Sequence, residues 1–125
     1  MRKALIMMAA LLAPVVAQAA PVHHHEVVMT VLYNAPHDPA AFESYYAKTH
    51  LPLVARIKGL ERVVLIKGTP GGDGAPPAFY RIAQLFFASP AQMARSMGSP
   101  AAQTAVADIK NFADGGVTVV TGEIP

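Results

Sequence analysis

Four short segments of the chain are rich in β-branched and aromatic residues and are bounded by polar or turn-forming residues. They span residues 26–33, 61–68, 79–88 and 117–122. These residue types favour the extended backbone of a pleated sheet, so the pattern predicts four strands. The first and third segments are mostly apolar at both alternating sets of positions, with Thr30, Arg81 and Gln84 as the exceptions. Both faces of the predicted sheet are therefore expected to be covered.

A helix is predicted to follow the first strand, starting at Asp38-Pro39. The Asp38 carboxylate is a good N-cap, and Pro39 fits the first helical position, where no N–H is needed. Residues with the spacing of one helical face are Phe42, Tyr45, Tyr46 and Thr49. Pro52 disfavours helical angles at Leu51, which predicts that the helix ends near His50. Any further short turn is expected to end at Gly59.

The region between the third and fourth strands predicts a pair of helices. Ser89 and Gln92 have the spacing of a capping box, and Gly98 is expected to end this helix. A second helix is predicted to start at Ser99-Pro100, and its expected apolar stripe contains Ala102, Val106, Ile109 and Ala113. Residues 69–78 are Gly- and Pro-rich and predict a connector, because no phosphate-loop signature follows them.

The order of these elements is strand, helix, strand, strand, helix pair, strand. This βαββαβ order predicts an α+β fold of the ferredoxin-like type, with a four-stranded antiparallel sheet that carries its helices on one face. A single copy would leave the second, largely apolar face in water, and large apolar patches are uncommon on soluble monomers. A second copy packed sheet against sheet covers that patch. The sequence therefore predicts a homodimer, a dimeric α+β barrel.

Residues 1–19 have the layout of a secretory signal peptide. Two basic residues precede an apolar run, and Ala17-Gln18-Ala19 supplies small residues for cleavage. The pattern predicts a cleaved leader, a lead-in at 20–26 and one domain at 27–122. The mature protein is then expected in the periplasm or outside the cell, without stable insertion in a membrane.

Loss of this leader changes the charge of the chain. The full sequence has 10 Lys and Arg residues against 8 Asp and Glu; without Arg2 and Lys3 the basic count is 10 − 2 = 8, and the formal net charge falls from +2 to 0. A neutral domain without a basic run lacks the electrostatic footprint of a nucleic-acid binder. The chain has no cysteine, so its stability is expected to depend on an apolar core rather than on disulfides.

One group of residues resembles a known family motif. They are Pro36, Asp38, Phe42, Tyr45-Tyr46, His50-Leu51-Pro52-Leu53 and Gly59-Leu60. The pattern is similar to the EthD family, densely over residues 36–60 and weakly over 27–122. The resemblance implies a ferredoxin-like dimeric barrel with a ligand cavity between sheet and helices. It also implies a link to bacterial breakdown of ethers and related small organics, commonly labelled oxidoreductase activity, and relatives in aromatic polyketide biosynthesis are cyclases or dehydratases.

His50 is the first candidate for chemistry, and the sequence leaves two interpretations open. As the last ring of a helix, it is a C-terminal residue whose positive form the helix dipole favours. On a helical wheel it also lies at the edge of the aromatic face, beside Glu43 and Ala47, with one side available to a cavity. There an imidazole would serve as general acid or base, or donate a hydrogen bond to a carbonyl or phenol oxygen.

Tyr46 and Tyr33 are predicted to orient a substrate beside His50 as further catalytic residues. Other candidates for ligand contact are Tyr45, Phe42, Tyr80 and Arg81. The alternative for Tyr45 and Tyr46 is a core role, in which each hydroxyl finds one hydrogen-bond partner. An apolar pocket with a few hydroxyls and one imidazole suits a small, largely hydrophobic or phenolic ligand.

No cofactor is predicted. The chain has no dinucleotide-binding glycine motif, no haem-attachment motif and no thiol pair. Two alternatives are a haem bound through His50 and a metal bound by His23–His25, although adjacent histidines on a strand point to opposite faces.

The sequence thus predicts an exported EthD-like protein that acts on a small organic molecule. The chemistry would be of oxidoreductase type or a cofactor-independent proton transfer with His50 as acid or base. Two alternatives have no catalysis: a periplasmic barrel that only binds a small ligand, and a dimerisation module for another partner.

Overall fold

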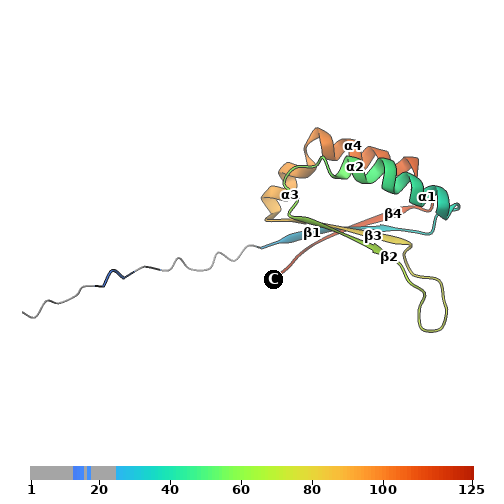
Figure 1. The fold of residues 1–125 in the computed structure, drawn as a ribbon, viewed down its shortest axis with the longest axis horizontal. Coiled ribbons are helices and arrows are strands. Elements are labelled where there is room, and N and C mark those ends of the chain that lie inside the picture. The colour runs from blue at the N-terminus through green and yellow to red at the C-terminus, as the bar shows by residue number, and fades with distance from the viewer. Residues whose placement is uncertain (1–12, 16, 18–24) are drawn as a thin grey trace, which may run out of the picture.

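A four-stranded sheet carries its helices on one face in a computed structural model that describes residues 13–15, 17 and 25–125 (Figure 1). The strands are β1 (Val27–Tyr33), β2 (Arg62–Lys67), β3 (Arg81–Phe87) and β4 (Val117–Glu123). The helical elements are α1 (Pro39–Tyr45), η1 (Tyr46–His50), α2 (Leu51–Val54), α3 (Pro90–Met97), α4 (Pro100–Asp108) and η2 (Ile109–Asn111). The predicted leader and His23–His24 lie largely outside the described residues.

The sheet has the order β2-β3-β1-β4, and all three neighbouring pairs are antiparallel. Thr30 at the centre of β1 faces Gln84 of β3 on one side and Val120 of β4 on the other. This arrangement confirms the predicted ferredoxin-like α+β fold, and the four strands lie within two residues of their predicted bounds. In Figure 1 the connector between β2 and β3 hangs from the side of the sheet opposite the helices.

The helix starts follow local capping chemistry. Asp38 accepts a hydrogen bond from the Ala41 N–H at 3.0 Å, and Ser89 accepts one from the Gln92 N–H at 3.1 Å. Each cap satisfies an N–H group that would otherwise lack a partner at a helix start. The predicted caps are therefore confirmed. Gly59 has a φ of 90°, and a Cβ there would lie 2.1 Å from Nε2 of Gln92, so this position requires glycine.

The first helix does not end at His50, which corrects the sequence prediction. It continues through a π-helical turn, η1, into α2, and Leu51 keeps helical angles (φ −59°, ψ −37°). The Leu51 N–H donates to the Tyr46 carbonyl five residues back, and Pro52 lies in the first turn of α2, where its missing N–H is tolerated. The wide turn also changes the buried face, because His50 is buried whereas Thr49, expected there, is exposed.

The core between sheet and helices is built around aromatic rings. Tyr33 of β1 and Phe42 of α1 are each 2% exposed, and their ring centroids lie 5.6 Å apart in an edge-to-face contact. Phe112 packs against both at 5.6 and 5.2 Å. Such rings bury large apolar areas and prefer these geometries, so they hold the first helix against β1.

Two strands and one helix leave apolar residues in solvent. Every residue of β2 and β4 is exposed, because these are the edge strands of the sheet. Val106 of α4, which belongs to the predicted apolar stripe, is 54% exposed, whereas Ala102 of the same stripe is buried together with Ala105. Among the described residues, none of the helices has the length and apolar character needed to cross a membrane.

Candidate functional site

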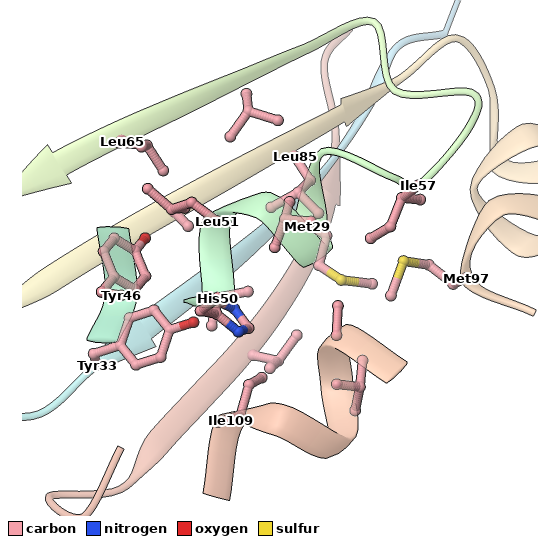
Figure 2. A pocket seen from close by; sticks show the side chains of 17 residues that line it. Met29, Tyr33, Tyr46, His50, Leu51, Ile57, Leu65, Leu85, Met97 and Ile109 are labelled. Atoms are coloured by element: carbon pink, nitrogen blue, oxygen red, sulfur yellow. The ribbon is translucent and has the colours of Figure 1, made fainter. Parts of the chain in front are cut away.

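A cavity of about 250 Å³ lies between the sheet and the helices (Figure 2). Its walls are almost entirely apolar, with three residues that carry polar side-chain atoms: Tyr33, Tyr46 and His50. The apolar walls come from all four strands and from α2, α3, α4 and η2, and comprise Met29, Val31, Leu51, Val54, Ile57, Val63, Leu65, Ala83, Leu85, Met97, Ala105, Val106, Ile109 and Val119. The structure thus brings together the three residues predicted to be catalytic.

His50 reaches this cavity because of the π turn. Its ring stacks on Tyr46, with centroids 5.8 Å apart and an interplanar angle of 19°, and lies 4.6 Å from the Phe112 ring. The residue is only 4% exposed. π turns of this kind occur frequently at functional sites, where they redirect a side chain. His50 is therefore a buried ring in contact with both the aromatic core and the cavity, and the helix continues beyond it.

Asp108, at the end of α4, holds the His50 ring in place. Its Oδ2 lies 3.0 Å from Nδ1 of His50, and its Oδ1 accepts hydrogen bonds from Tyr45 Oη at 2.5 Å and Asn111 Nδ2 at 3.0 Å. A carboxylate beside Nδ1 favours the tautomer that carries its proton on Nδ1. The lone pair of Nε2 is then left for the cavity.

Asp108 was not among the residues singled out from the sequence. A local signal was present, because Asp108 follows buried Ala105 by three residues and so lies on the same helical face. A carboxylate on a buried face requires partners, and those partners come from α1 and η1, which are remote in sequence.

The charge states of this pair follow from burial and hydrogen bonding. Burial acts to raise the pKa of Asp108, but the hydrogen bonds from Tyr45, Asn111 and His50 outweigh it and lower that pKa. Burial lowers the pKa of His50, and the attraction of Asp108 offsets this only in part. At neutral pH the site therefore holds an ionised carboxylate and a neutral imidazole, which is the form of a general base.

Tyr33 and Tyr46 keep their protons beside this base. Burial raises the pKa of both phenols, to about 12 for Tyr46. In Figure 2 the Tyr33 hydroxyl points toward the His50 ring. A protonated phenol donates a hydrogen bond, so the cavity combines a base with potential donors.

Comparison with known families identifies the chain. The family model described as EthD domain matches residues 34–116, which include all the helical elements and the strands β2 and β3. The chain belongs to the EthD family. The resemblance inferred from the His50-Leu51-Pro52-Leu53 motif is thereby confirmed.

Several relatives share the EthD fold over most of their length. An uncharacterized 11.0 kDa protein from the thcB-thcC intergenic region of Rhodococcus erythropolis is 45% identical over 92 residues, which are 74% of this chain and 88% of the relative. An EthD family protein from Bacillus halodurans C-125 is 25% identical with a TM-score of 0.75, over 80% of this chain and 99% of its own. An EthD-like protein from Ralstonia eutropha JMP134 is 26% identical with a TM-score of 0.63. The match covers 80% of this chain and 92% of that protein.

More distant structures share the fold alone. A cofactor-independent oxygenase from Streptomyces nogalater is 20% identical with a TM-score of 0.54 and covers 81% of this chain. A hydroxynitrile lyase from Passiflora edulis is 15% identical with a TM-score of 0.63 and covers 82%. A dimeric ferredoxin-like protein of unknown function from Thermobifida fusca is 12% identical with a TM-score of 0.60, also over 82%.

The four residues expected to contact a ligand do not line the cavity of this EthD protein. Tyr45 points to Asp108, and together with Phe42 it borders a second, more polar hollow of about 230 Å³. Tyr80 and Arg81 both donate hydrogen bonds to the Glu43 carboxylate. The Tyr80 hydroxyl lies 2.8 Å from its Oε1, and a guanidinium nitrogen of Arg81 lies 2.6 Å from its Oε2. The Arg81 hydrogen bond lowers the pKa of Glu43, so this group forms an ion pair that joins α1 to β3.

No cluster of three or more His, Cys, Asp or Glu side chains that could hold a metal ion occurs among the described residues. A haem would be a poor match for the cavity, because its propionates pair best with cations and no described lining residue is Lys or Arg. The possible metal site at His23–His25 lies mostly outside the described residues.

The lowered pKa of His50 predicts a pH dependence of stability. The unfolded chain, with a histidine pKa of about 6.5, binds the proton more readily than the folded protein. The stability that neutral His50 contributes is therefore fully present above about pH 6.5 and is lost as pH falls through the lower folded value. Asp108 acts in the same direction, but only below about pH 4.

We expect the free energy of unfolding in urea to fall from about pH 7.5 to about pH 5. His50→Gln, which keeps a hydrogen-bond donor for Asp108 but does not titrate, is expected to flatten this slope. An identical slope in the variant and the natural protein would assign the pH dependence to other groups.

Proposed function

We propose that this EthD protein binds a small, largely apolar organic molecule between its sheet and helices, and that His50 transfers a proton to or from it. The main support is the hydrogen bond between His50 Nδ1 and Asp108 Oδ2, because it leaves Nε2 free to accept a proton from a ligand in the apolar cavity. Asp108 is the positioning residue, because it fixes the tautomer and stabilises the imidazolium formed when His50 takes a proton.

The composition of the cavity favours a neutral ligand. None of the described residues that line it is Lys, Arg, Asp or Glu, so a charged molecule would lose its hydration without gaining an ion pair. The same composition supports chemistry that uses only the residues of the site, in a fold that this chain shares with a cofactor-independent oxygenase and a hydroxynitrile lyase. Oxidoreductase-type chemistry is the alternative within this proposal and would use oxygen or the substrate itself as the redox partner.

Native mass spectrometry of the protein purified from its own host tests the binding. We expect a retained neutral organic molecule in the natural protein. Val106 borders the cavity and is 54% exposed, so Val106→Trp is expected to block entry and reduce the retained mass. Ala107→Trp is the matched control, because Ala107 is exposed on the same helix and does not line the cavity. Equal retention in both variants contradicts the proposed site.

A non-catalytic ligand-binding protein is the second candidate. The observation in its favour is the almost wholly apolar wall, which suffices to bind a hydrophobic molecule. It predicts that His50→Ala binds the ligand as tightly as the natural protein and that no product forms on long incubation.

We propose that two copies pack against each other through the face of the sheet that carries no helices. That face exposes Val64, Ile66 and Val120, and the half-buried residues Val28, Leu32 and Ile82 lie on it as well. Covering such a patch is favourable by about 25 cal/mol per Å² of apolar surface. The distant structure from Thermobifida fusca is that of a dimeric protein, which supports a dimer but not a particular arrangement.

Gel filtration is expected to give about twice the monomer mass for the natural protein and about one monomer mass for Ile66→Lys, because a charge buried in an apolar interface is costly. Thr104→Lys places the same charge on an exposed position of α4 and is expected to remain dimeric. A monomer in the natural protein contradicts this part of the proposal.

We also propose that the protein is exported and cleaved after Ala19. The support is the pattern of two basic residues, an apolar run and Ala17-Gln18-Ala19. N-terminal sequencing of the protein from the periplasm or medium should begin at Ala20, and recovery of Met1 in the cytoplasm would contradict export.

A further inference from the structure

The hydroxyl of Tyr46 is buried without a hydrogen bond. Among buried side-chain nitrogen and oxygen atoms of the described residues, it is the only one in this situation. A buried hydroxyl without a partner destabilises the fold, because it loses its hydrogen bond to water and gains none in the protein. Two other phenols of this region have partners, since Tyr45 donates to Asp108 and Tyr80 donates to Glu43. A hydroxyl kept unpaired at this cost indicates a partner that arrives with the ligand.

Tyr46 and His50 belong to the same wall of the cavity. They occupy one turn of η1, their rings are stacked with centroids 5.8 Å apart, and both line the cavity (Figure 2). Because burial keeps the phenol protonated, the Tyr46 hydroxyl is a donor while His50 Nε2 is an acceptor. A ligand that lies against this wall meets one hydrogen-bond donor and one base.

This pairing of a donor with a base suits a carbonyl group and its neighbouring carbon. The carbonyl oxygen accepts a hydrogen bond, and the adjacent C–H can lose its proton to a base. A carboxylate is disfavoured, because no described lining residue is Lys or Arg, and Arg81, which lies 5.5 Å from the Tyr46 ring centroid, already binds Glu43 at 2.6 Å.

We propose that the substrate is a neutral, largely apolar ketone, with its carbonyl oxygen bound by Tyr46 and the proton on its adjacent carbon removed by His50. This inference rests on the proposed role of His50 as a base. The C–H electron pair forms a carbon–carbon double bond, and the π pair of the carbonyl moves to the oxygen. The enolate oxygen accepts the hydrogen bond of Tyr46, and the proton stays on Nε2. Its return to the same carbon gives exchange, and its delivery to a conjugated carbon gives isomerisation, without a redox change.

Three probes of one size and shape test this assignment. Benzylacetone is the ketone, isopentylbenzene is the hydrocarbon of the same outline, and hydrocinnamate is the carboxylate. Ligand-observed NMR measures binding of each, and loss of the proton signals beside the carbonyl in deuterium oxide measures enolisation. We expect binding in the order ketone, hydrocarbon, carboxylate, and exchange of benzylacetone faster than in buffer.

Tyr46→Phe is expected to slow this exchange by about 10²-fold, the usual loss of one donor to a developing oxyanion, and to narrow the preference for ketone over hydrocarbon. Tyr80→Phe removes a hydroxyl that donates to Glu43 outside the cavity, so it is expected to keep the natural exchange rate. Urea unfolding keeps the test interpretable: Tyr46→Phe is expected to be at least as stable as the natural protein, because it removes an unpaired buried hydroxyl.

Each other outcome has a distinct meaning. If benzylacetone binds without accelerated exchange, or if Tyr46→Phe exchanges at the natural rate, the ketone inference is overturned while the proposed role of the cavity stands. If none of the three probes binds, the inference and the proposed apolar ligand site fail together.

Discussion

His50→Ala is expected to slow proton transfer to a ligand in the cavity by about 10²–10⁴-fold, the range of a general acid–base residue. The physical reason is that His50 is the only imidazole of the described residues that lines the cavity, and it is neutral at pH 7 because burial lowers its pKa. The tyrosines beside it remain protonated and do not replace a base. Deuterium exchange of benzylacetone measures the effect.

His50→Gln separates chemistry from packing in this experiment. Its amide keeps a donor for Asp108 but has no basic nitrogen, so it is expected to lose exchange as His50→Ala does while retaining more stability. Isopentylbenzene binding by both variants is the control for an intact cavity. Natural exchange rates in either variant, with binding preserved, would contradict the role of His50.

Asp108→Ala is expected to lower the free energy of unfolding by roughly 3 kcal/mol, because it leaves His50, Tyr45 and Asn111 without their shared acceptor. For a domain of this size that loss corresponds to a fall in Tm of roughly 10–20 °C. Thermal unfolding followed by circular dichroism measures it.

Asp114→Ala is the matched control for this loss. Asp114 also binds a histidine, His37, at 3.0 Å, but both side chains are more than half exposed. An exposed pair of this kind contributes about 0–1 kcal/mol, so little change is expected. Equal losses in Asp108→Ala and Asp114→Ala would contradict the structural role assigned to the buried carboxylate.

The parts of the fold that depend on local sequence could be predicted. β-Branched and aromatic residues indicated the strands, and Asp38 and Ser89 indicated helix starts, because these signals act within a few residues. Their order then identified the ferredoxin-like arrangement. The partial exposure of Val106 could not be predicted in the same way, because an apolar stripe does not reveal how closely its neighbours pack.

The site was predicted in part, for two physical reasons. Pro52 indicates a helix end under the usual rule, but the π turn places Pro52 near the start of a new segment, and this shifts His50 onto the buried face that Thr49 was expected to occupy. Asp108 lies 58 residues from His50, so their contact follows from tertiary packing. His50, Tyr46 and Tyr33 were singled out from residue type and motif, and all three line the cavity.

NMR spectroscopy of protein labelled with ¹⁵N at histidine tests the central claim most directly, since the two ring nitrogens report which one carries the proton. His50→Gln assigns the His50 signals among the five histidines of the sequence. At neutral pH we expect His50 to be neutral with its proton on Nδ1, to titrate below about pH 6.5, and to lose this preference in Asp108→Asn. A His50 ring that carries its proton on Nε2, or that is charged at neutral pH, would contradict its assignment as the base of the cavity.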